Sequence, residues 1–236
     1  MNDKNDLILK REIMDFWEKY SHEYSTGSRT YNRKIKILKD RMEIKYNSLI
    51  LDIGCGKTIA YDLARQNNIV CLDISEKMLK ILKGEINKTC FNGKIHLIRG
   101  DANLLPFKDE TFDYVISITT FQYIPNLSLL IKEIKRVLKK HGSIGITIPN
   151  PTSPYNIFKI IFGNKILYPK RTIGLDRKII QQLLNEGFRD VEIVRTVFFP
   201  STPKILHHFY SSVEKLLEKI PLVKNLAVSL IIIGRK

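Results

Sequence analysis

Two glycines and an aspartate follow an apolar run in the first third of the chain. Leu49-Ile50-Leu51-Asp52-Ile53 leads directly into Gly54-Cys55-Gly56. Glycine lets a chain turn tightly and lets a ligand approach the backbone closely. In doubly wound α/β folds, loops at the carboxyl ends of strands bind nucleotides. The pattern favours a nucleotide-like ligand, although a plain tight turn would also account for two glycines.

A second acidic residue strengthens this interpretation. Asp73 ends the apolar run 69–73 and stands 21 positions after Asp52. An acidic side chain at the end of the second strand accepts hydrogen bonds from ribose hydroxyl groups. The glycine turn and Asp73 together indicate a ligand that contains a ribose.

Three kinds of nucleotide site differ in what they require at this turn. A P-loop requires a glycine where Leu51 stands, so Gly56-Lys57-Thr58 matches only the end of that motif. A dinucleotide site requires a third glycine where Ile59 stands, and Asp52 would bring negative charge near its pyrophosphate. S-adenosylmethionine has no phosphate and carries a cationic sulfonium and an ammonium group, so Asp52 favours it.

At these residues the chain resembles the class I S-adenosylmethionine-dependent methyltransferases. The resemblance is to their small-molecule branch, which includes quinone-biosynthesis and natural-product enzymes. It runs over about residues 48–148, and five motifs occur in the family's order and spacing. These motifs are 51–56, 70–75, 100–107, 112–117 with 122–125, and 133–142. The resemblance implies a Rossmann-like fold, S-adenosylmethionine as the cofactor and S-adenosylhomocysteine as the product.

The resemblance also implies roles for individual residues. Asp73 would bind the ribose, and Asp101 and the Ala102 N–H would bind the adenine. In related enzymes an N-terminal tyrosine covers the cofactor, and Tyr24, or alternatively Tyr20, is the candidate here, although aromatic packing of a helix explains both equally well. The expected cofactor-binding residues are Tyr24, Asp52, Gly54, Cys55, Gly56, Asp73, Ile74, Asp101, Ala102, Ile118, Thr119, Gln122 and Tyr123.

Two positions depart from the family's pattern. Lys57-Thr58 follow Gly56 where a small residue is common, and Gln122 stands where many members have histidine. The glutamine would change contacts to the methionine moiety without abolishing binding.

The three cysteines, Cys55, Cys71 and Cys90, form no C-x-x-C pair, so no metal site or disulfide framework is expected.

The methyl acceptor is less well defined than the cofactor. The segments 149–175 and 199–227 are rich in apolar and aromatic residues and are expected to form a lid. Such a lid suits a small aromatic or lipid-like acceptor, although the same helices would also simply cover the sheet. Candidates for the catalytic base are His207, His208 and Tyr123.

The net charge of +15 leaves other partners open. It favours anionic partners, so an RNA methyltransferase is the first alternative, and peripheral contact with an anionic membrane is a further expectation. The Asn/Asp-Pro-Pro-aromatic motif of adenine methylation is missing at 117–120, which reads Ser-Ile-Thr-Thr. A non-catalytic cofactor-binding protein and a nicotinamide oxidoreductase remain as alternatives of other classes.

Alternating elements must position these residues. Apolar runs at 48–53, 69–73, 95–99, 111–117 and 143–148 alternate with helical patterns at 59–66, 76–86 and 127–140. This alternation predicts a doubly wound, mostly parallel sheet. Strands at 190–199 and 229–233 suit an antiparallel edge pair, giving a seven-stranded sheet of the α/β class. Further helices are expected at 176–185, with Asp176 as N-cap and Gly187 at its end, and at 204–227, with a break at Pro221.

We therefore expect one methyltransferase domain over residues 1–236. It consists of a helical cap at 1–45, a cofactor-binding core at 46–148 and the two lid insertions. The longest apolar stretch, 226–233, is far shorter than the ~20 residues of a membrane-spanning helix. Without an apolar leader, and with three cysteines, the sequence favours a cytoplasmic setting.

Overall fold

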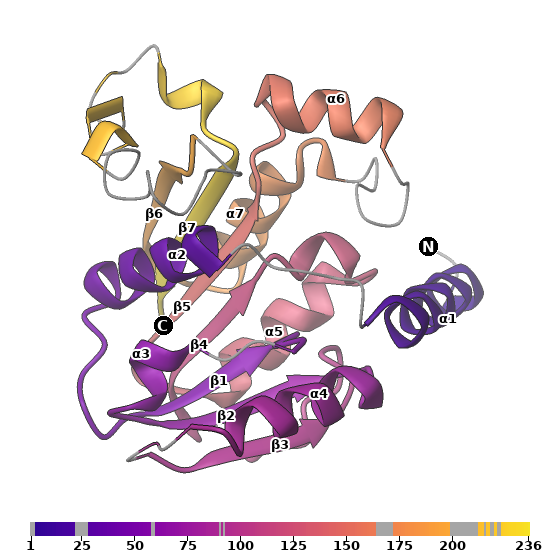
Figure 1. Ribbon diagram of the computed structural model, residues 1–236, viewed down its shortest axis with the longest axis vertical. Helices are drawn as coiled ribbons and strands as arrows, with labels where there is room; N and C mark the ends of the chain where they lie inside the picture. Colours follow the sequence, from indigo (N-terminus) through magenta and orange to yellow (C-terminus); the bar gives the residue numbers. More distant parts are fainter. Residues whose placement is uncertain are drawn as a thin grey trace.

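A seven-stranded sheet forms the centre of the protein (Figure 1). The computed structural model describes residues 3–21, 28–57, 60–89, 91, 93–163, 172–198, 212–214, 216–217, 220 and 223–236. The strand order is β3-β2-β1-β4-β5-β7-β6. The strands are β1 (Leu49–Ile53), β2 (Asn68–Asp73), β3 (Ile95–Arg99), β4 (Phe112–Ile118), β5 (Leu138–Pro149), β6 (Arg189–Thr196) and β7 (Ser229–Arg235).

The strand directions confirm the predicted fold class. The strands β3, β2, β1, β4 and β5 pair in parallel, whereas β7 pairs antiparallel with both β5 and β6. The reversed strand therefore lies one position in from the edge, and β6 forms the edge itself. Five parallel neighbours place the carboxyl ends of β1 to β4 at the same side of the sheet, where a doubly wound fold binds its ligand.

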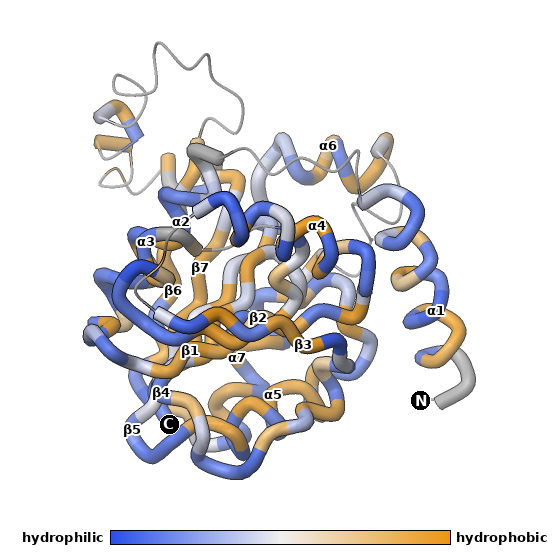
Figure 2. The backbone as a smooth tube through the Cα atoms, turned by 60° about the horizontal axis from the view of Figure 1, so that its bottom comes forward, coloured by the Kyte–Doolittle hydropathy of each residue, from blue (hydrophilic) through white to orange (hydrophobic). Residues whose placement is uncertain are grey.

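Helices cover both faces of the sheet, which explains why its inner strands are apolar nearly throughout. One buried cluster contains Leu51 and Ile53 of β1 together with residues of α5 (Leu127–Val137) and α7 (Leu175–Asn185). The other contains Ile50 together with residues of α2 (Ser28–Arg41), α3 (Tyr61–Ala64) and α4 (Glu76–Ile86). Successive residues of β1 thus enter opposite cores, as a strand's alternation requires. Figure 2 shows the apolar strands between these helices.

Local sequence fixes where two of these helices begin. The Ser75 side chain caps α4 by accepting a hydrogen bond from the Met78 N–H at 3.2 Å. The Asn126 side chain caps α5 in the same way, at 3.0 Å from the Leu129 N–H. Both residue types satisfy backbone donors that the first turn of a helix leaves unpaired.

The predicted ends of two helices were wrong. Helix α5 ends at Val137 rather than at residue 140, because buried Leu138 already pairs with Phe112 in the sheet. Helix α7 is capped by Gly174 rather than by Asp176, which lies in the first turn. An acidic side chain there still interacts favourably with the helix dipole. Gly187 follows α7 with a positive φ of 80°, as predicted for its terminating glycine.

Helices outside the core surround the carboxyl ends of the strands. Helix α1 (Asp3–Tyr20) contacts α4, and α6 (Pro154–Phe162) follows β5 within the expected lid segment 149–175. Of the predicted helix 204–227, residues 212–214 and 216–217 are helical and Val223–Leu226 form a 3-10 turn. Residues 204–211, 215, 218–219 and 221–222, and with them the predicted break at Pro221, lie outside the described residues. Within the described part of the chain, no helix is both long and apolar enough to cross a membrane.

Candidate functional site

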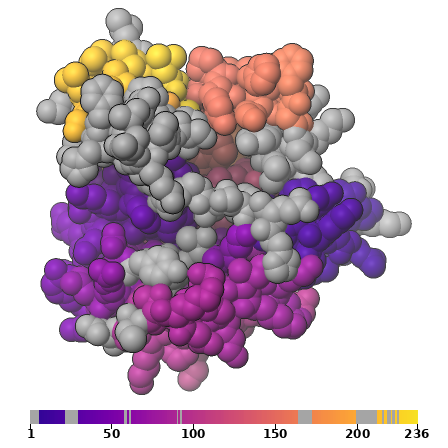
Figure 3. All heavy atoms as spheres, viewed as in Figure 1, coloured from indigo at the N-terminus to yellow at the C-terminus, as the bar shows by residue number. Residues whose placement is uncertain are grey.

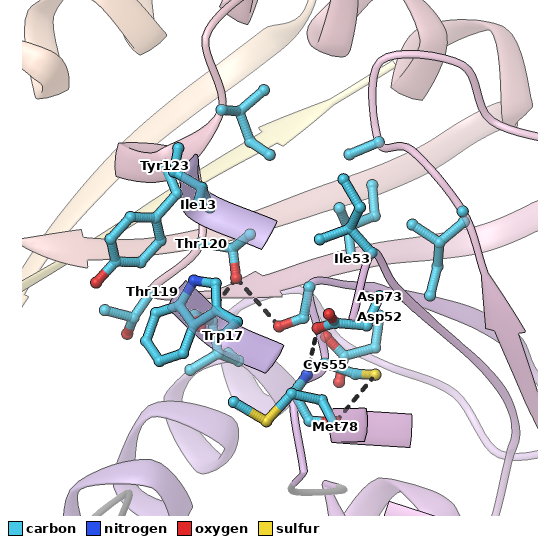
Figure 4. A pocket seen from close by; sticks show the side chains of 18 of the residues that line it. Ile13, Trp17, Asp52, Ile53, Cys55, Asp73, Met78, Thr119, Thr120 and Tyr123 are labelled. Atoms are coloured by element: carbon cyan, nitrogen blue, oxygen red, sulfur yellow. Dashed lines mark hydrogen bonds between the residues drawn. The ribbon is translucent and has the colours of Figure 1, made fainter. Parts of the chain in front are cut away.

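A cavity of about 340 Å³ lies at the carboxyl ends of the parallel strands (Figure 4). Asp101 and Ala102 follow β3, Asp73 ends β2, Asp52 lies in β1, and Thr119 follows β4. Since β3, β2, β1 and β4 are neighbours in this order, these residues form a row across the sheet edge.

The structure brings nearly all of the predicted cofactor-binding residues to this cavity. Those that line it are Asp52, Gly54, Cys55, Gly56, Asp73, Ile74, Asp101, Ala102, Ile118, Thr119 and Tyr123. Gln122 does not line it: its side chain is buried and donates a hydrogen bond to the Thr119 carbonyl at 2.9 Å. Tyr24 lies outside the described residues.

Of the three candidates for the catalytic base, the structure describes one. Tyr123 lines the cavity, and its ring lies edge-on to Trp17 of α1, with centroids 5.5 Å apart. His207 and His208 lie outside the described residues. Tyr20, the alternative to Tyr24, stacks with Phe16 at 4.7 Å, which agrees with aromatic packing within α1.

The turn after β1 requires glycine for both conformation and space. Gly54 and Gly56 have positive φ values of 69° and 60°. A Cβ on Gly54 would lie 2.3 Å from the Thr120 side chain, whose hydroxyl donates a hydrogen bond to the Gly54 carbonyl at 3.1 Å. The turn therefore packs closely against Thr120 only as long as residue 54 has no side chain, whereas a Cβ on Gly56 would meet no atom within 4 Å.

Backbone donors hold the Asp73 carboxylate in place. Its Oδ2 accepts a hydrogen bond from the Gly56 N–H at 2.8 Å, and its Oδ1 accepts one from the Ser75 N–H at 2.9 Å. Burial raises the pKa of Asp73, while these two bonds oppose the rise. The carboxylate thus ties the glycine turn to the end of β2 and retains acceptor capacity for a ligand.

The Asp52 carboxyl group has no such support. It is only 1% exposed, and neither of its oxygens has a hydrogen-bond partner among the residues that the structure describes. Burial, and then the negative charge of Asp73, raises the pKa of Asp52 to about 8. A buried acid without partners is costly, and a ligand that brings a positive charge or donors would remove the cost.

Sequence analysis missed the contribution of the two N-terminal helices. Lys10, Ile13 and Trp17 of α1 line the cavity, as do Thr30, Tyr31 and Lys34 of α2. Lys10 forms an ion pair with Asp101. The spacing of Lys10, Ile13 and Trp17 puts them on one helix face, but that pattern alone did not show what the face covers. The newly found lining is completed by Ile53, Lys57, Leu72, Met78, Gly100, Asn103, Thr120, Ile124 and Pro125.

A family model for a methyltransferase domain matches residues 51–146. These residues run from the end of β1 into β5 and include every strand-end residue of the row described above. The match therefore falls on the strand ends and loops of the cavity wall, and not on its α1 and α2 residues.

Two relatives illustrate the range of similarity. An uncharacterized protein of Methanocaldococcus jannaschii is 30% identical over 227 residues, which is 89% of this chain and 93% of the relative. A demethylmenaquinone methyltransferase of Staphylococcus haemolyticus is 38% identical over 132 residues. This second match spans about half of each protein, 53% of both.

The fold is also that of solved methyltransferases. Phosphoethanolamine N-methyltransferase 2 of Haemonchus contortus, in complex with S-adenosyl-L-methionine, superposes with a TM-score of 0.64. The identity is 19%, and the alignment covers 95% of this chain and 60% of that one. At such low identity the superposition shows the shared architecture.

Proposed function

The chain belongs to the class I S-adenosylmethionine-dependent methyltransferases, and we propose that it methylates a small aromatic or lipid-like acceptor. The observation that carries this proposal is the apolar part of the cavity wall. Its members are Ile13, Trp17, Ile118, Tyr123, Ile124 and Pro125. Charged and polar groups form the rest of the wall, and the apolar part suits the apolar surface of a small molecule.

The residues present fit S-adenosylmethionine. The unpartnered, buried Asp52 carboxyl group suits the positively charged methionine end of the cofactor, and the open glycine turn suits close approach to the backbone. We assign Asp73 to the ribose, and Asp101 with the Ala102 N–H to the adenine. The remaining predicted residues of the cavity complete the cofactor site, while Gln122 acts through the Thr119 carbonyl. Tyr24 stays a prediction.

The residues of this chain bind, orient and enclose the reactants. When bound, S-adenosylmethionine supplies an electrophilic methyl group, so catalysis depends mainly on alignment. Helix α1 covers the adenine side, where Lys10 pairs with Asp101, and Trp17 meets Tyr123 across the cavity. These contacts hold α1 against the loops that follow β3 and β4.

Two further observations support the choice of acceptor. The demethylmenaquinone methyltransferase match points to a lipid-like aromatic substrate, and it covers the cofactor core rather than the whole of either protein. Helix α6, in the proposed lid segment 149–175, lies on the surface (Figure 3), and five of its apolar side chains are exposed to solvent. They are Tyr155, Ile157, Phe158, Ile161 and Phe162.

This exposed face of α6 also supports contact with an anionic membrane. An apolar helix face on a protein with a net charge of +15 has the two features of a peripheral membrane helix. Such contact would bring the cavity to a lipid-like acceptor.

The proposed setting of the reaction is cytoplasmic. Cys55 and Cys71 are free thiols in the structure, while Cys90 lies outside the described residues.

Parallel calorimetric titrations test the proposal first. We expect S-adenosylmethionine and S-adenosylhomocysteine to bind with micromolar affinity and NAD not to bind. A panel of phenols, reduced quinones and lipids, incubated with labelled S-adenosylmethionine, should then yield a methylated product. Failure of every small acceptor, together with methylation of bulk RNA, would contradict the small-molecule assignment.

A further inference from the structure

Lys34 is a polar group of the cavity wall that the cofactor assignment does not use. It lies on α2, one turn after Thr30 and Tyr31, and all three line the cavity. Its Nζ donates a hydrogen bond to the Thr119 hydroxyl at 3.2 Å. This bond places the amino group beside the end of β4.

Thr119 is itself held firmly. Its N–H donates to the carbonyl of Thr147 at 2.9 Å and lies 3.0 Å from the Thr147 hydroxyl. Its φ of +61° is one that β-branched residues rarely adopt. Such backbone strain persists where the surrounding structure enforces it, often at functional sites. The position of the Lys34 amino group is therefore fixed by a rigid partner.

No described carboxylate forms an ion pair with Lys34. The other charged groups of this region have partners of their own or stand apart. Lys10 pairs with Asp101, Lys57 donates to the Ser21 carbonyl at 2.7 Å, and Asp73 accepts two backbone N–H bonds. On α2 itself, Arg33 contacts Thr196 and Glu214.

Burial is the cause that lowers the pKa of Lys34 to about 8. Neither the unpaired Asp52 carboxyl group nor Asp73 contributes to this shift. The remaining titratable groups that line the cavity are Tyr31, Cys55 and Tyr123. Of these, Cys55 is neutral, because burial raises the pKa of its thiol well above the ordinary value. The Lys34 amino group therefore releases its proton at a pH of about 8, close to neutrality. No described acidic group forms an ion pair with it.

The strand order separates Lys34 from the adenosine side of the site. Asp101 follows β3, whereas Thr119 follows β4, and β2 and β1 lie between them. Three strand spacings of ~4.8 Å put these two ends ~14 Å apart. Lys34 therefore faces the end of the cavity that the adenosine does not reach.

We propose that Lys34 takes up the proton of an acidic hydroxyl group on the methyl acceptor, a phenol or an enol. The O–H bond of the acceptor breaks, its electron pair stays on the oxygen, and the proton forms a new bond to the neutral Nζ. The resulting ammonium then pairs with the oxyanion in the partly apolar cavity. This inference rests on the proposed function and narrows its acceptor class to ionisable hydroxyl compounds.

Binding of a chromogenic phenol tests the inference without methyl transfer. The probe is 3-nitrophenol, added to the protein with S-adenosylhomocysteine at a pH of about 8, where part of Lys34 is neutral and most of the free phenol still carries its proton. We expect the wild type to produce the phenolate absorption band on binding, and Lys34→Met to lose about tenfold or more in phenolate affinity. Lys36→Met, an exposed position on the same helix, is the matched control. An unchanged band in Lys34→Met would overturn the inference.

An arginine variant separates proton uptake from charge. Lys34→Arg keeps a positive charge but does not titrate in this range. We expect it to bind the phenolate, whereas the rise of kcat/KM with pH toward about 8, where Lys34 releases its proton, should disappear. The same rise in Lys34→Arg and in the wild type would contradict proton uptake by Lys34. Thermal unfolding of each variant checks that the fold is retained.

The cofactor's own carboxylate is the other source of an anion at this position. Titration with S-adenosylhomocysteine and with 5′-methylthioadenosine, which lacks the amino-acid group, distinguishes the two. We expect Lys34→Met to bind both as the wild type does. A loss confined to S-adenosylhomocysteine would assign Lys34 to the cofactor and overturn the inference.

The same experiments distinguish failure of this inference from failure of the proposed function. A Lys34-dependent phenolate band without methylation of any small acceptor would leave the Lys34 assignment standing and contradict the function. Efficient methylation of an acceptor that has no ionisable hydroxyl group, with no phenolate band, would contradict the Lys34 assignment alone.

Discussion

Three residues at the carboxyl ends of β1 and β2 show how single side chains define the site. Asp73 is held by two backbone N–H groups, Gly54 lies too close to Thr120 for a Cβ to fit, and Asp52 is buried with no hydrogen-bond partner in the described part of the chain. The first two organise the turn whether or not a ligand is present. The third is satisfied only when a ligand supplies donors or positive charge, so its cost favours the bound state.

Replacement of Asp73 tests the ribose assignment. We expect Asp73→Ala to reduce affinity for S-adenosylhomocysteine by about tenfold or more, because a charged acceptor for the ribose hydroxyls is lost. The exposed Asp62 of α3 provides the control Asp62→Ala, which should bind as the wild type does. Calorimetry measures both, and equal affinity of Asp73→Ala and the wild type would contradict the assignment.

The raised pKa of Asp52 predicts how stability depends on pH without cofactor. The folded protein keeps this carboxyl protonated up to a pH of about 8, whereas the unfolded chain releases the proton near pH ~4. The folded state binds more protons between these values, so the free energy of unfolding falls as pH rises from 4 to about 8. Lys34 stays protonated over most of this range in both states.

Asp52→Asn should therefore flatten the pH dependence of urea unfolding between pH 5 and about 8. The amide cannot ionise, so the variant gains stability over the wild type as pH rises, on the order of a few kcal/mol near the upper limit. Saturating S-adenosylhomocysteine should also reduce the slope in the wild type. An equal slope in Asp52→Asn and the wild type would show that other groups cause it.

Gly54→Ala tests the space beside the turn. The new Cβ would lie 2.3 Å from Thr120 at a φ of +69°, so we expect a loss of about 1–3 kcal/mol in unfolding free energy and a loss of cofactor binding. Gly84→Ala is the contrasting control, because nothing lies within 4 Å of a Cβ at that position in α4. It should stabilise by about 0.5–1 kcal/mol. Equal effects of both changes would contradict a specific role of Gly54.

Helices decide what surrounds the row of strand-end residues. Helices α1 and α2 contribute Lys10, Trp17 and Lys34 to the cavity, although the family model matches only residues 51–146. Helix α6 follows β5 and keeps only Asn156 and Ile160 buried, which leaves most of its apolar residues exposed. The match to the family model thus covers the cofactor core, whereas α1, α2 and α6 lie outside the matched residues.

The exposed face of α6 gives a prediction at this scale. Phe158 and Phe162 are 60% and 72% exposed. The double variant Phe158→Asp/Phe162→Asp should reduce co-sedimentation with phosphatidylglycerol vesicles, because it removes inserted apolar area and adds negative charge. Leu184→Asp, at a residue 55% exposed on α7, should leave co-sedimentation unchanged. If both variants bind vesicles as the wild type does, α6 is not the contact.

At the scale of the whole molecule, net charge and cavity shape support different partners. The charge of +15 acts over the surface and favours any polyanion, including RNA. The cavity of about 340 Å³ is local, and its apolar wall suits a small molecule. We give the cavity more weight, because charge alone sets non-specific affinity rather than chemistry.

Salt dependence distinguishes these partners. Turnover of a small acceptor should change little between low and physiological ionic strength, whereas RNA binding through phosphates weakens steeply with salt. We expect filter binding to show only weak, strongly salt-dependent association with RNA. Tight RNA binding that persists at physiological salt, together with methyl incorporation into RNA, would favour the alternative acceptor.

The sequence by itself determined the strand-end chemistry and the order of the core. Asp52, the glycine turn, Asp73 and Asp101 could be located because each follows an apolar run that only a buried parallel strand explains. Once those strands are parallel neighbours, their carboxyl ends must meet. The strands expected at 190–199 and 229–233 are found at 189–196 and 229–235, and they form the predicted antiparallel pair near one edge.

Only the tertiary structure decided which helix faces close the cavity and where helices end. An amphipathic pattern shows that a face is buried, but the partner of that face depends on packing between distant segments. Lys34 and Trp17 therefore entered the site only through the placement of α1 and α2. Likewise α5 stops at Val137 because Leu138 pairs with Phe112 in the sheet, a contact that no local signal at residues 138–142 reveals.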